Sequence, residues 1–464
     1  MSANLGQTAA PATWNKRVFW RLILVQAGLM VLTVIRQEWL LLLLMPVVFL
    51  LLFALIERNP LHAIFLILFS IFFGSISNLP LASKIPQLFV VDLIFFVVVV
   101  SLVLRAIMRS DLLHISLATV EKWFLIFLGF CLLTVFKAVD PLRGLALFKN
   151  LLAGLLVFEI VLRFVKTREQ IINLVQLLMF WGTVLAVIQL ITMFNQGDLL
   201  ETIRRKNIHL SFGSSNYIAA FYVVLIGLGL PRLFTPSLST NKRLSLGAVI
   251  FLMLTCLFLT GSRGGVVALF VGFLVVLFRF RSLKKLLLIL PFSLLVAIAI
   301  YLNPSSRIVF AGLVDFRTSA SVLTRLELWL ESWRLFRENP WFGVGLGNVD
   351  FHIHLKLSPV FYTKAHNLVL ELLSEIGLPG FLLFAGFFAA VLMLQIRSCR
   401  RIENPTSNLL AWGFLCATLA AFVHSLFEPT ITTYFFGIVF WIIIGLSVVL
   451  NRLAQNPQQG AVNE

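Results

Sequence analysis

The sequence contains little charge for its length. Lys, Arg, Asp and Glu make up 12% of the 464 residues, and only 20 residues are acidic. A water-soluble domain of this size carries roughly twice that share of charged residues, so an ordinary soluble globular protein is excluded. Cysteine is also scarce, with four in the chain. Three lie in apolar runs and Cys399 lies in a short basic segment, so no pair predicts a disulfide or a metal site.

The sequence is instead rich in long hydrophobic runs. The chain is 60% hydrophobic with a mean hydropathy of +0.99. Runs of about 20 residues, the length that crosses a bilayer as a helix, recur along it, and helices satisfy their backbone amides in lipid. We therefore expect an all-α integral membrane protein with about 12–14 transmembrane helices and one long periplasmic loop. The candidate spans are 18–36, 39–56, 62–77, 87–107, 121–138, 142–164, 171–193, 215–235, 244–261, 264–280, 285–302, 378–397, 408–427 and 433–451.

The distribution of Lys and Arg predicts the orientation of the chain. Alternate loops are much richer in these residues, which places both termini in the cytoplasm. The same bias accounts for much of the net charge of +17 without a nucleic-acid partner. The expected order is a cytoplasmic tail, an N-terminal transmembrane bundle, a periplasmic loop with catalytic residues, an interfacial helix with the last three spans, and a cytoplasmic tail. The corresponding ranges are 1–17, 18–302, 303–366, 367–452 and 453–464.

Several cations lie on the outer side, against this preference. A cationic cluster placed there predicts an anionic ligand, and arginine offers a planar fork that suits phosphate oxygens. The alternative is contact with lipid headgroups or with acidic side chains of the same loop. The outward cations are Arg204, Arg205, Lys206, Arg263, Arg307, Arg317, Arg325, Arg334 and Arg337.

His366 begins a segment with a polar helical face. Residues at spacings of three, four and seven share one side of a helix, and here they are Asn367, Glu371, Ser374 and Glu375. The Gly and Pro residues of 377–380 predict a break before the next span. Histidine accepts protons near neutral pH, so His366 is a candidate general base. The alternatives are a structural histidine, with Glu371 or Glu375 as the base, or a reaction that needs none.

Two further features of the sequence are the ionisable residues within candidate spans and a glycine-rich stretch. Asp92, Lys149, Glu159 and His424 are ionisable residues within candidate spans, where such groups are functional suspects, and Asp92 and Lys149 are candidates for a pair. The GVGLGN stretch at 343–348 lacks the spacing and setting of a dinucleotide fingerprint. It is interpreted as a flexible turn.

Several segments together resemble one family. They are FGSSNYIAA from Phe212, TGSRGG from Thr260, LTRLELW from Leu323, NPWFGVGLGN from Asn339, and a His-Asn pair followed after nine residues by Gly-x-x-Gly, at 366–380. In this order, across roughly residues 200–445, the chain resembles the O-antigen ligase and polymerase superfamily of bacterial envelope enzymes.

The resemblance implies a glycosyltransferase that needs no metal or other cofactor, at the periplasmic face of the bacterial inner membrane. The donor would be a glycan on undecaprenyl pyrophosphate in the bilayer, and the acceptor a lipid A core or a growing glycan. By motif, Arg263 and Arg325 would bind the pyrophosphate and His366 would be the base. The family's lysine would be Lys84 or Lys137. Further substrate contacts are predicted at Arg204, Arg205, Lys206, Asn216, Arg334, Asn367 and Glu375.

The superfamily contains several activities. The His-Asn and Gly-x-x-Gly match favours a ligase that transfers a glycan to the lipid A core. The alternatives are an O-antigen or exopolysaccharide polymerase and a protein O-oligosaccharyltransferase. A transporter of the lipid-linked glycan would also need outward arginines, but the sequence has no repeated halves of the kind that many transporters show.

Overall fold

The computed structural model describes residues 40–71, 90–109, 119–195, 214–280, 320–353 and 364–455. The chain divides into two compact units, one of residues 1–63 and 93–113, the other of residues 64–92 and 114–464. The first unit contains α2 (Leu40–Arg58) and most of α4 (Val90–Arg109). Within it, Arg105 Nη1 donates to the backbone oxygen of Glu57 at 2.5 Å. The second unit contains Glu428, His366 and the other residues of the site described below.

The described part of the chain is helical and has no strand, as expected for an all-α membrane protein. Each predicted span within the described residues overlaps a helix, while the spans at 18–36 and 285–302 lie outside them. Eight described helices are long and apolar enough to cross a membrane. They are α6 (Pro141–Phe164), α7 (Arg168–Asn195), α9 (Ser215–Gly229) with η4 (Leu230–Phe234), α10 (Thr240–Leu259), α11 (Arg263–Phe280), α16 (Leu368–Arg401), α17 (Pro405–Ser425) and α18 (Tyr434–Gln455). The shorter helices of this unit are α3 (His62–Ser70), α5 (Thr119–Val135), α15 (Ala320–Glu338), η5 (Val349–Phe351) and η6 (Thr430–Thr432).

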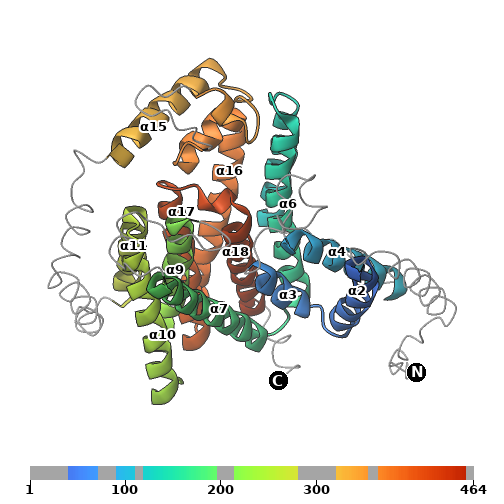
Figure 1. The fold of residues 1–464 in the computed structure, drawn as a ribbon. Coiled ribbons are helices and arrows are strands. Elements are labelled where there is room, and N and C mark those ends of the chain that lie inside the picture. The colour runs from blue at the N-terminus through green and yellow to red at the C-terminus, as the bar shows by residue number, and fades with distance from the viewer. Residues whose placement is uncertain are drawn as a thin grey trace, which may run out of the picture. The chain divides into compact units, whose positions relative to one another are not determined.

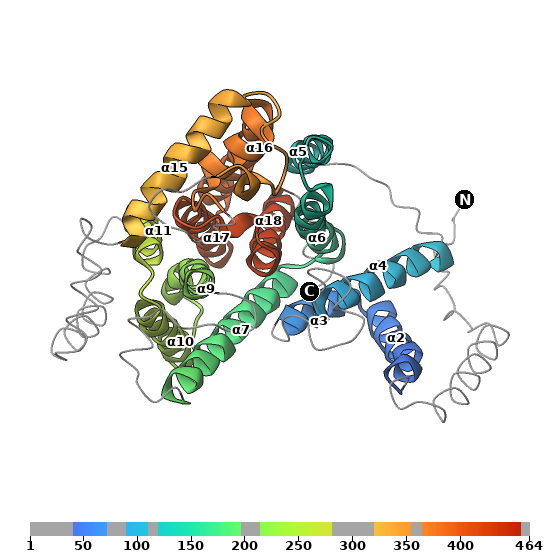
Figure 2. The ribbon, with the colours of Figure 1, turned by 45° about the horizontal axis from the view of Figure 1, so that its top comes forward.

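Helix α18 is the core of the second unit. It packs against α6, α16 and α17. Of its most hydrophobic 18-residue stretch, 94% is buried. Figure 1 shows α17 and α18 in the middle of this unit, with α6 beside α18 and with α9 and α11 beside α17; Figure 2 shows the same order. Close packing of α6 and α18 depends on glycine, because a side chain at Gly154 would collide with the Trp441 ring. Small residues serve this purpose between membrane helices generally.

Proline and glycine interrupt α16 near its start. Gly377 has φ 69° and ψ −175°, so the helix is broken there, as the sequence predicts. The amide of Leu378 turns away and donates to the Pro340 oxygen at 2.7 Å. Pro379 has no amide proton to donate. The break therefore leaves the carbonyl groups of Ser374 and Glu375 without their helical partners.

The 339–348 segment supplies those missing partners. Val344 donates to the Ser374 oxygen at 2.8 Å, and Gly345 donates to the Glu375 oxygen at 2.9 Å. A Cβ atom at Gly377 would lie 2.5 Å from the Trp341 backbone. The two segments of the chain therefore approach so closely here that only glycine fits. The turn predicted at 343–348 is present, but it is docked by backbone hydrogen bonds onto α16 rather than flexible. Local sequence could not reveal this, because the partners lie about 30 residues downstream.

Candidate active site

Glu428 lies between α17 and α18 at the centre of a hydrogen-bonded cluster. Only 4% of its surface is exposed. Its Oε2 atom lies 2.8 Å from Nδ1 of His366 and accepts from Nδ2 of Asn216 at 3.1 Å. The hydroxyl of Ser262 in turn donates to Oδ1 of Asn216 at 2.9 Å. The cluster thus joins α9, the turn before α11 and the start of α16 to the α17–α18 connection.

The charge of Glu428 determines which ring nitrogen of His366 carries the proton. Burial raises the pKa of Glu428, but the hydrogen bond from His366 and the nearby charges of Lys364 and Arg325 outweigh burial, so its pKa lies below the ordinary value. An ionised carboxylate only accepts hydrogen bonds. In neutral His366, Nδ1 therefore carries the proton, and Nε2 carries the lone pair. A carboxylate that orients an imidazole in this way is the usual partner of a histidine base.

The backbone of His366 is held in an unusual conformation. Its φ is 52°, the only positive φ among the described non-glycine residues. The left-handed region is unfavourable for a side chain such as histidine, and such strain gathers at functional sites. Ala365 before it is fully buried, and Asn367 after it caps α16. The ring is therefore positioned by the chain on both sides as well as by Glu428.

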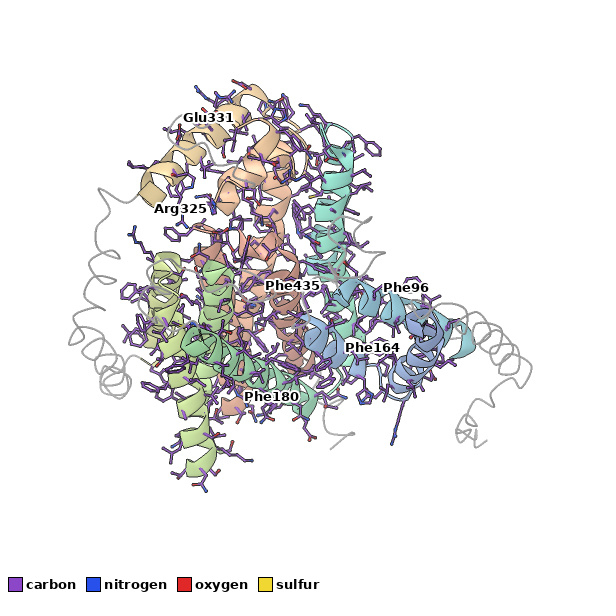
Figure 3. The ribbon with its side chains drawn as sticks, viewed as in Figure 1. Phe96, Phe164, Phe180, Arg325, Glu331 and Phe435 are labelled. Atoms are coloured by element: carbon purple, nitrogen blue, oxygen red, sulfur yellow. The ribbon has the colours of Figure 1, made fainter. Side chains whose placement is uncertain are left out.

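Two arginines lie beside this cluster. Arg263 is the first residue of α11, and Arg325 lies on α15. Burial lowers the pKa of Arg325, the charge of Glu428 opposes this, and the charge of Arg263 lowers the pKa further. Arg325 therefore lies within electrostatic range of both Arg263 and Glu428. Figure 3 shows Arg325 between α15 and the ends of α9 and α11. Partly buried arginines held together suit a polyanion such as a pyrophosphate.

Lys364 adds a cation that the sequence analysis missed. Its ammonium group lies 5.7 Å from the centroid of the Tyr217 ring. Burial lowers the pKa of Lys364, but Tyr217, Glu371 and Glu428 outweigh it, so the pKa is raised and the group stays charged. The predicted lysines differ from it. Lys137 donates to Asn339 at 3.1 Å, and Lys84 lies outside the described residues.

A cavity of about 320 Å³ opens next to the cluster. Lys364, Tyr217, Glu371 and Glu375 line it, together with residues of α6 and the start of α18. Glu371 and Glu375 are 3% and 4% exposed. The carboxylate of Glu371 accepts from the Ala365 amide, and that of Glu375 accepts from the Gly347 amide. Glu375, predicted as a substrate contact, therefore lies in the wall of a cavity.

Other predicted substrate contacts have different surroundings. Arg334 pairs with Glu331 at 2.9 Å and with Glu338 at 2.8 Å on its own helix, and it also donates to the His352 oxygen. The side chain of Asn367 accepts from two amides of the first turn of α16. The structure thus gives these two residues structural contacts and does not join them to the Glu428 cluster. Arg204, Arg205 and Lys206 lie outside the described residues.

Three of the four ionisable residues named in the predicted spans are in ion pairs. Lys149 pairs with Asp92 at 2.9 Å, as the sequence suggested, and the Tyr434 hydroxyl also donates to Asp92. Glu159 pairs with Arg163 at 3.0 Å. Of the residues that the structure describes, no group of three or more His, Cys, Asp and Glu is arranged to hold a metal ion.

Two residues of the site had only weak signals in the sequence. Glu428 is a lone carboxylate in a short connection between spans, and Lys364 precedes the His-Asn motif by two residues. Asking which outward loops contain acidic residues, as well as basic ones, would have drawn attention to Glu428. Its contact with His366 spans 62 positions, which no local pattern reveals.

The chain is similar to known proteins over part of its length. Residues 248–385 match the family model of the O-antigen ligases. That range contains Arg263, Arg325 and His366, while Asn216 and Glu428 lie outside it. Over 240 residues the chain is 26% identical to the teichuronic acid biosynthesis protein TuaE of Bacillus subtilis. The match covers 46% of this chain and 47% of the relative, so it spans about half of each protein. Residues 248–385 are thus similar to the O-antigen ligase family.

Proposed function

We propose that the protein is a glycosyltransferase that moves a glycan from undecaprenyl pyrophosphate to a sugar hydroxyl of the lipid A core. The observation that carries the proposal is the cluster at Glu428, where an oriented histidine lies close to two arginines. A base and a polyanion site are the two elements that this transfer requires. The family match at 248–385 supports the same class of reaction.

The proposed step is a single displacement at the anomeric carbon of the donor. Nε2 of His366 takes the proton of the acceptor hydroxyl as its oxygen bonds to that carbon. The bond between the anomeric carbon and the pyrophosphate oxygen breaks, and undecaprenyl pyrophosphate leaves with the bonding electrons. Glu428 stabilises the imidazolium that forms, and Arg263 and Arg325 stabilise the charge on the leaving group. All groups in this step come from the chain and its two substrates.

The proposed location is the bacterial inner membrane with the site at the periplasmic face. The eight membrane-spanning candidates support a multi-pass protein. The lipid carrier would lie in the bilayer with its pyrophosphate at the interface. This arrangement agrees with the site, whose residues belong to helix ends and connections rather than to helix centres.

A polymerase of the same superfamily is the second candidate. The relative in Bacillus subtilis is named for the biosynthesis of teichuronic acid, which favours an acceptor glycan other than a lipid A core. The site chemistry would be the same, because either acceptor presents a hydroxyl group. The two candidates differ in the glycan that accumulates.

The glycan phenotype of a deletion strain separates these candidates. A ligase predicts the loss of all long chains on lipid A, while the lipid-linked chains persist. A polymerase predicts a core that carries one repeat unit. If the glycans on lipid A and the lipid-linked glycans were both unchanged, the proposed function would be contradicted. Complementation with the parent gene and with His366→Ala shows whether the phenotype depends on the site.

A further inference from the structure

The cavity beside the cluster has buried acceptor atoms that the described residues do not satisfy. Oε2 of Glu371 and Oδ1 of Asn150 have no hydrogen-bond partner within the described ranges. Both residues line the cavity. A buried acceptor without a partner is costly, and such atoms are rare in proteins. Two of them around one cavity indicate a ligand that donates hydrogen bonds.

The remaining walls also suit an uncharged polar ligand. Tyr217, Tyr434 and Phe435 supply aromatic surface, and Figure 3 labels Phe435 at the start of α18. The cations and carboxylates of the walls offset each other, because Lys364 lies near Glu371 and Arg143 is paired with Asp350. The cavity therefore has no cationic excess that would select a phosphate. Apolar walls with a few placed polar groups are typical of small-molecule sites.

The cavity is separate from the two arginines, because neither Arg263 nor Arg325 lines it. Helices α11, α17, α18 and α6 pack in that order, each against the next. The views in Figures 1 and 2 agree, with α11 and α6 on opposite sides of the α17–α18 pair. Arg263 begins α11, while the cavity is lined by residues of α6, α9, α16 and the start of α18. Glu428 lies in the connection between α17 and α18.

We propose that this cavity binds the acceptor glycan, whose sugar hydroxyls donate to Glu371 and Asn150. The inference rests on the proposed function and adds a location for the acceptor. In a single displacement the attacking oxygen and the leaving group lie on opposite sides of the anomeric carbon. With the pyrophosphate at Arg263 and Arg325, the acceptor needs a separate space, and this cavity, which neither arginine lines, provides one.

Steady-state kinetics of transfer test the inference. The assay uses the purified full chain, lipid-linked donor and acceptor glycolipid, both extracted from the deletion strain. Glu371→Gln keeps the size of the side chain and replaces one accepting oxygen with an NH₂ group, which corresponds to a loss of ~10-fold or more in affinity. We expect the acceptor KM to rise by that factor while the donor KM stays at the parent value. Glu169→Gln, an exposed carboxylate on α7, is the matched control.

Two kinetic outcomes overturn the inference. One is an unchanged acceptor KM in Glu371→Gln. The other is an equal rise in donor KM, which would place the donor in the cavity. If the parent protein transfers no glycan at all, the proposed function fails instead, and the cavity is then tested by binding alone.

Thiol labelling provides that binding test. The four native cysteines are buried, so a cysteine at Thr433, which lines the cavity, can be followed with N-ethylmaleimide. We expect the delipidated acceptor oligosaccharide to slow labelling of Thr433→Cys and to leave labelling of the exposed control Glu403→Cys unchanged. Equal labelling of Thr433→Cys with and without the oligosaccharide contradicts a glycan site, whatever the transferase assay shows. Slowed labelling at both positions contradicts it as well, because the effect would be unspecific.

Discussion

Replacing Glu428 with Gln removes the negative charge beside His366 while it preserves the size of the side chain. The two side chains meet at 2.8 Å and are only 5% and 23% exposed, so solvent screens the contact poorly. A hydrogen bond to a charged group contributes ~1.5–3 kcal/mol. At 1.36 kcal/mol for each factor of ten, its loss in the transition state corresponds to about 10- to 160-fold in rate.

The amide also changes which nitrogen of the histidine is protonated. The NH₂ group of Gln can donate to Nδ1 of His366, and the ring proton then moves to Nε2. The base is lost in that tautomer, and general-base catalysis contributes ~10²–10⁴-fold. We therefore expect kcat to fall at least about tenfold and at most about 10⁴-fold, with donor binding unchanged because the arginines remain.

The measurement is single-turnover transfer from a lipid-linked donor, followed across pH. The folded pKa of Glu428 is lowered, so its contribution is fully present above the ordinary Glu value of about 4.3 and disappears only as pH falls through the folded value. In the parent, the part of the rate that depends on the Glu428 charge should therefore be lost only at pH below about 4.3, and Glu428→Gln should lack this loss.

Two comparisons make the result interpretable. Glu331→Gln removes a carboxylate of α15 that pairs with Arg334, and it should leave the rate and the pH profile unchanged. Glu428→Asp keeps the charge and should retain more activity than Glu428→Gln. A Glu428→Gln protein with the parent rate and the parent pH profile would refute the reasoning.

The remaining predictions concern the arginines, the helix break and the orientation. Arg263→Lys and Arg325→Lys keep the charge and lose the planar fork, so we expect weaker donor binding at normal membrane abundance; parent-like binding in both variants would refute a phosphate role. Gly377→Ala places a Cβ atom 2.5 Å from the Trp341 backbone, so the thermal midpoint should fall, whereas Gly129→Ala meets no atom within 4 Å and should not lower it. Alkaline phosphatase fused within 303–365 should be active, and an inactive fusion would place the proposed site in the cytoplasm.

The parts of the fold that follow from local sequence were predicted well. Apolar runs and their boundaries agree with the described helices, because a helix in lipid needs about 20 apolar residues whatever its neighbours are. The break at Gly377 was also predicted, since glycine and proline act on the chain locally. Local spacing also predicts the contacts of Arg334. Its partners Glu331 and Glu338 lie at i−3 and i+4, which already predicts ion pairs on a helix.

The site itself depends on contacts between distant segments. The resemblance named Arg263, Arg325 and His366, and the structure places Arg325 within electrostatic range of Arg263 and of Glu428, which contacts His366. Glu428 and Lys364 were missed, because their importance comes from packing and not from any spacing. Asn216 was named with the substrate contacts, and its observed partners are Glu428 and Ser262.

The central claim, that His366 is the general base, is tested most directly by His366→Ala in a transfer assay run beside a donor-binding measurement. The assay uses purified parent and variant protein with the same lipid-linked donor, and His62→Ala at the start of α3 is the control. We expect transfer to fall by roughly 10²–10⁴-fold while the donor binds as tightly as it does to the parent. Transfer by His366→Ala at close to the parent rate would contradict the account and would move the role to Glu371, to Glu375 or to no base at all.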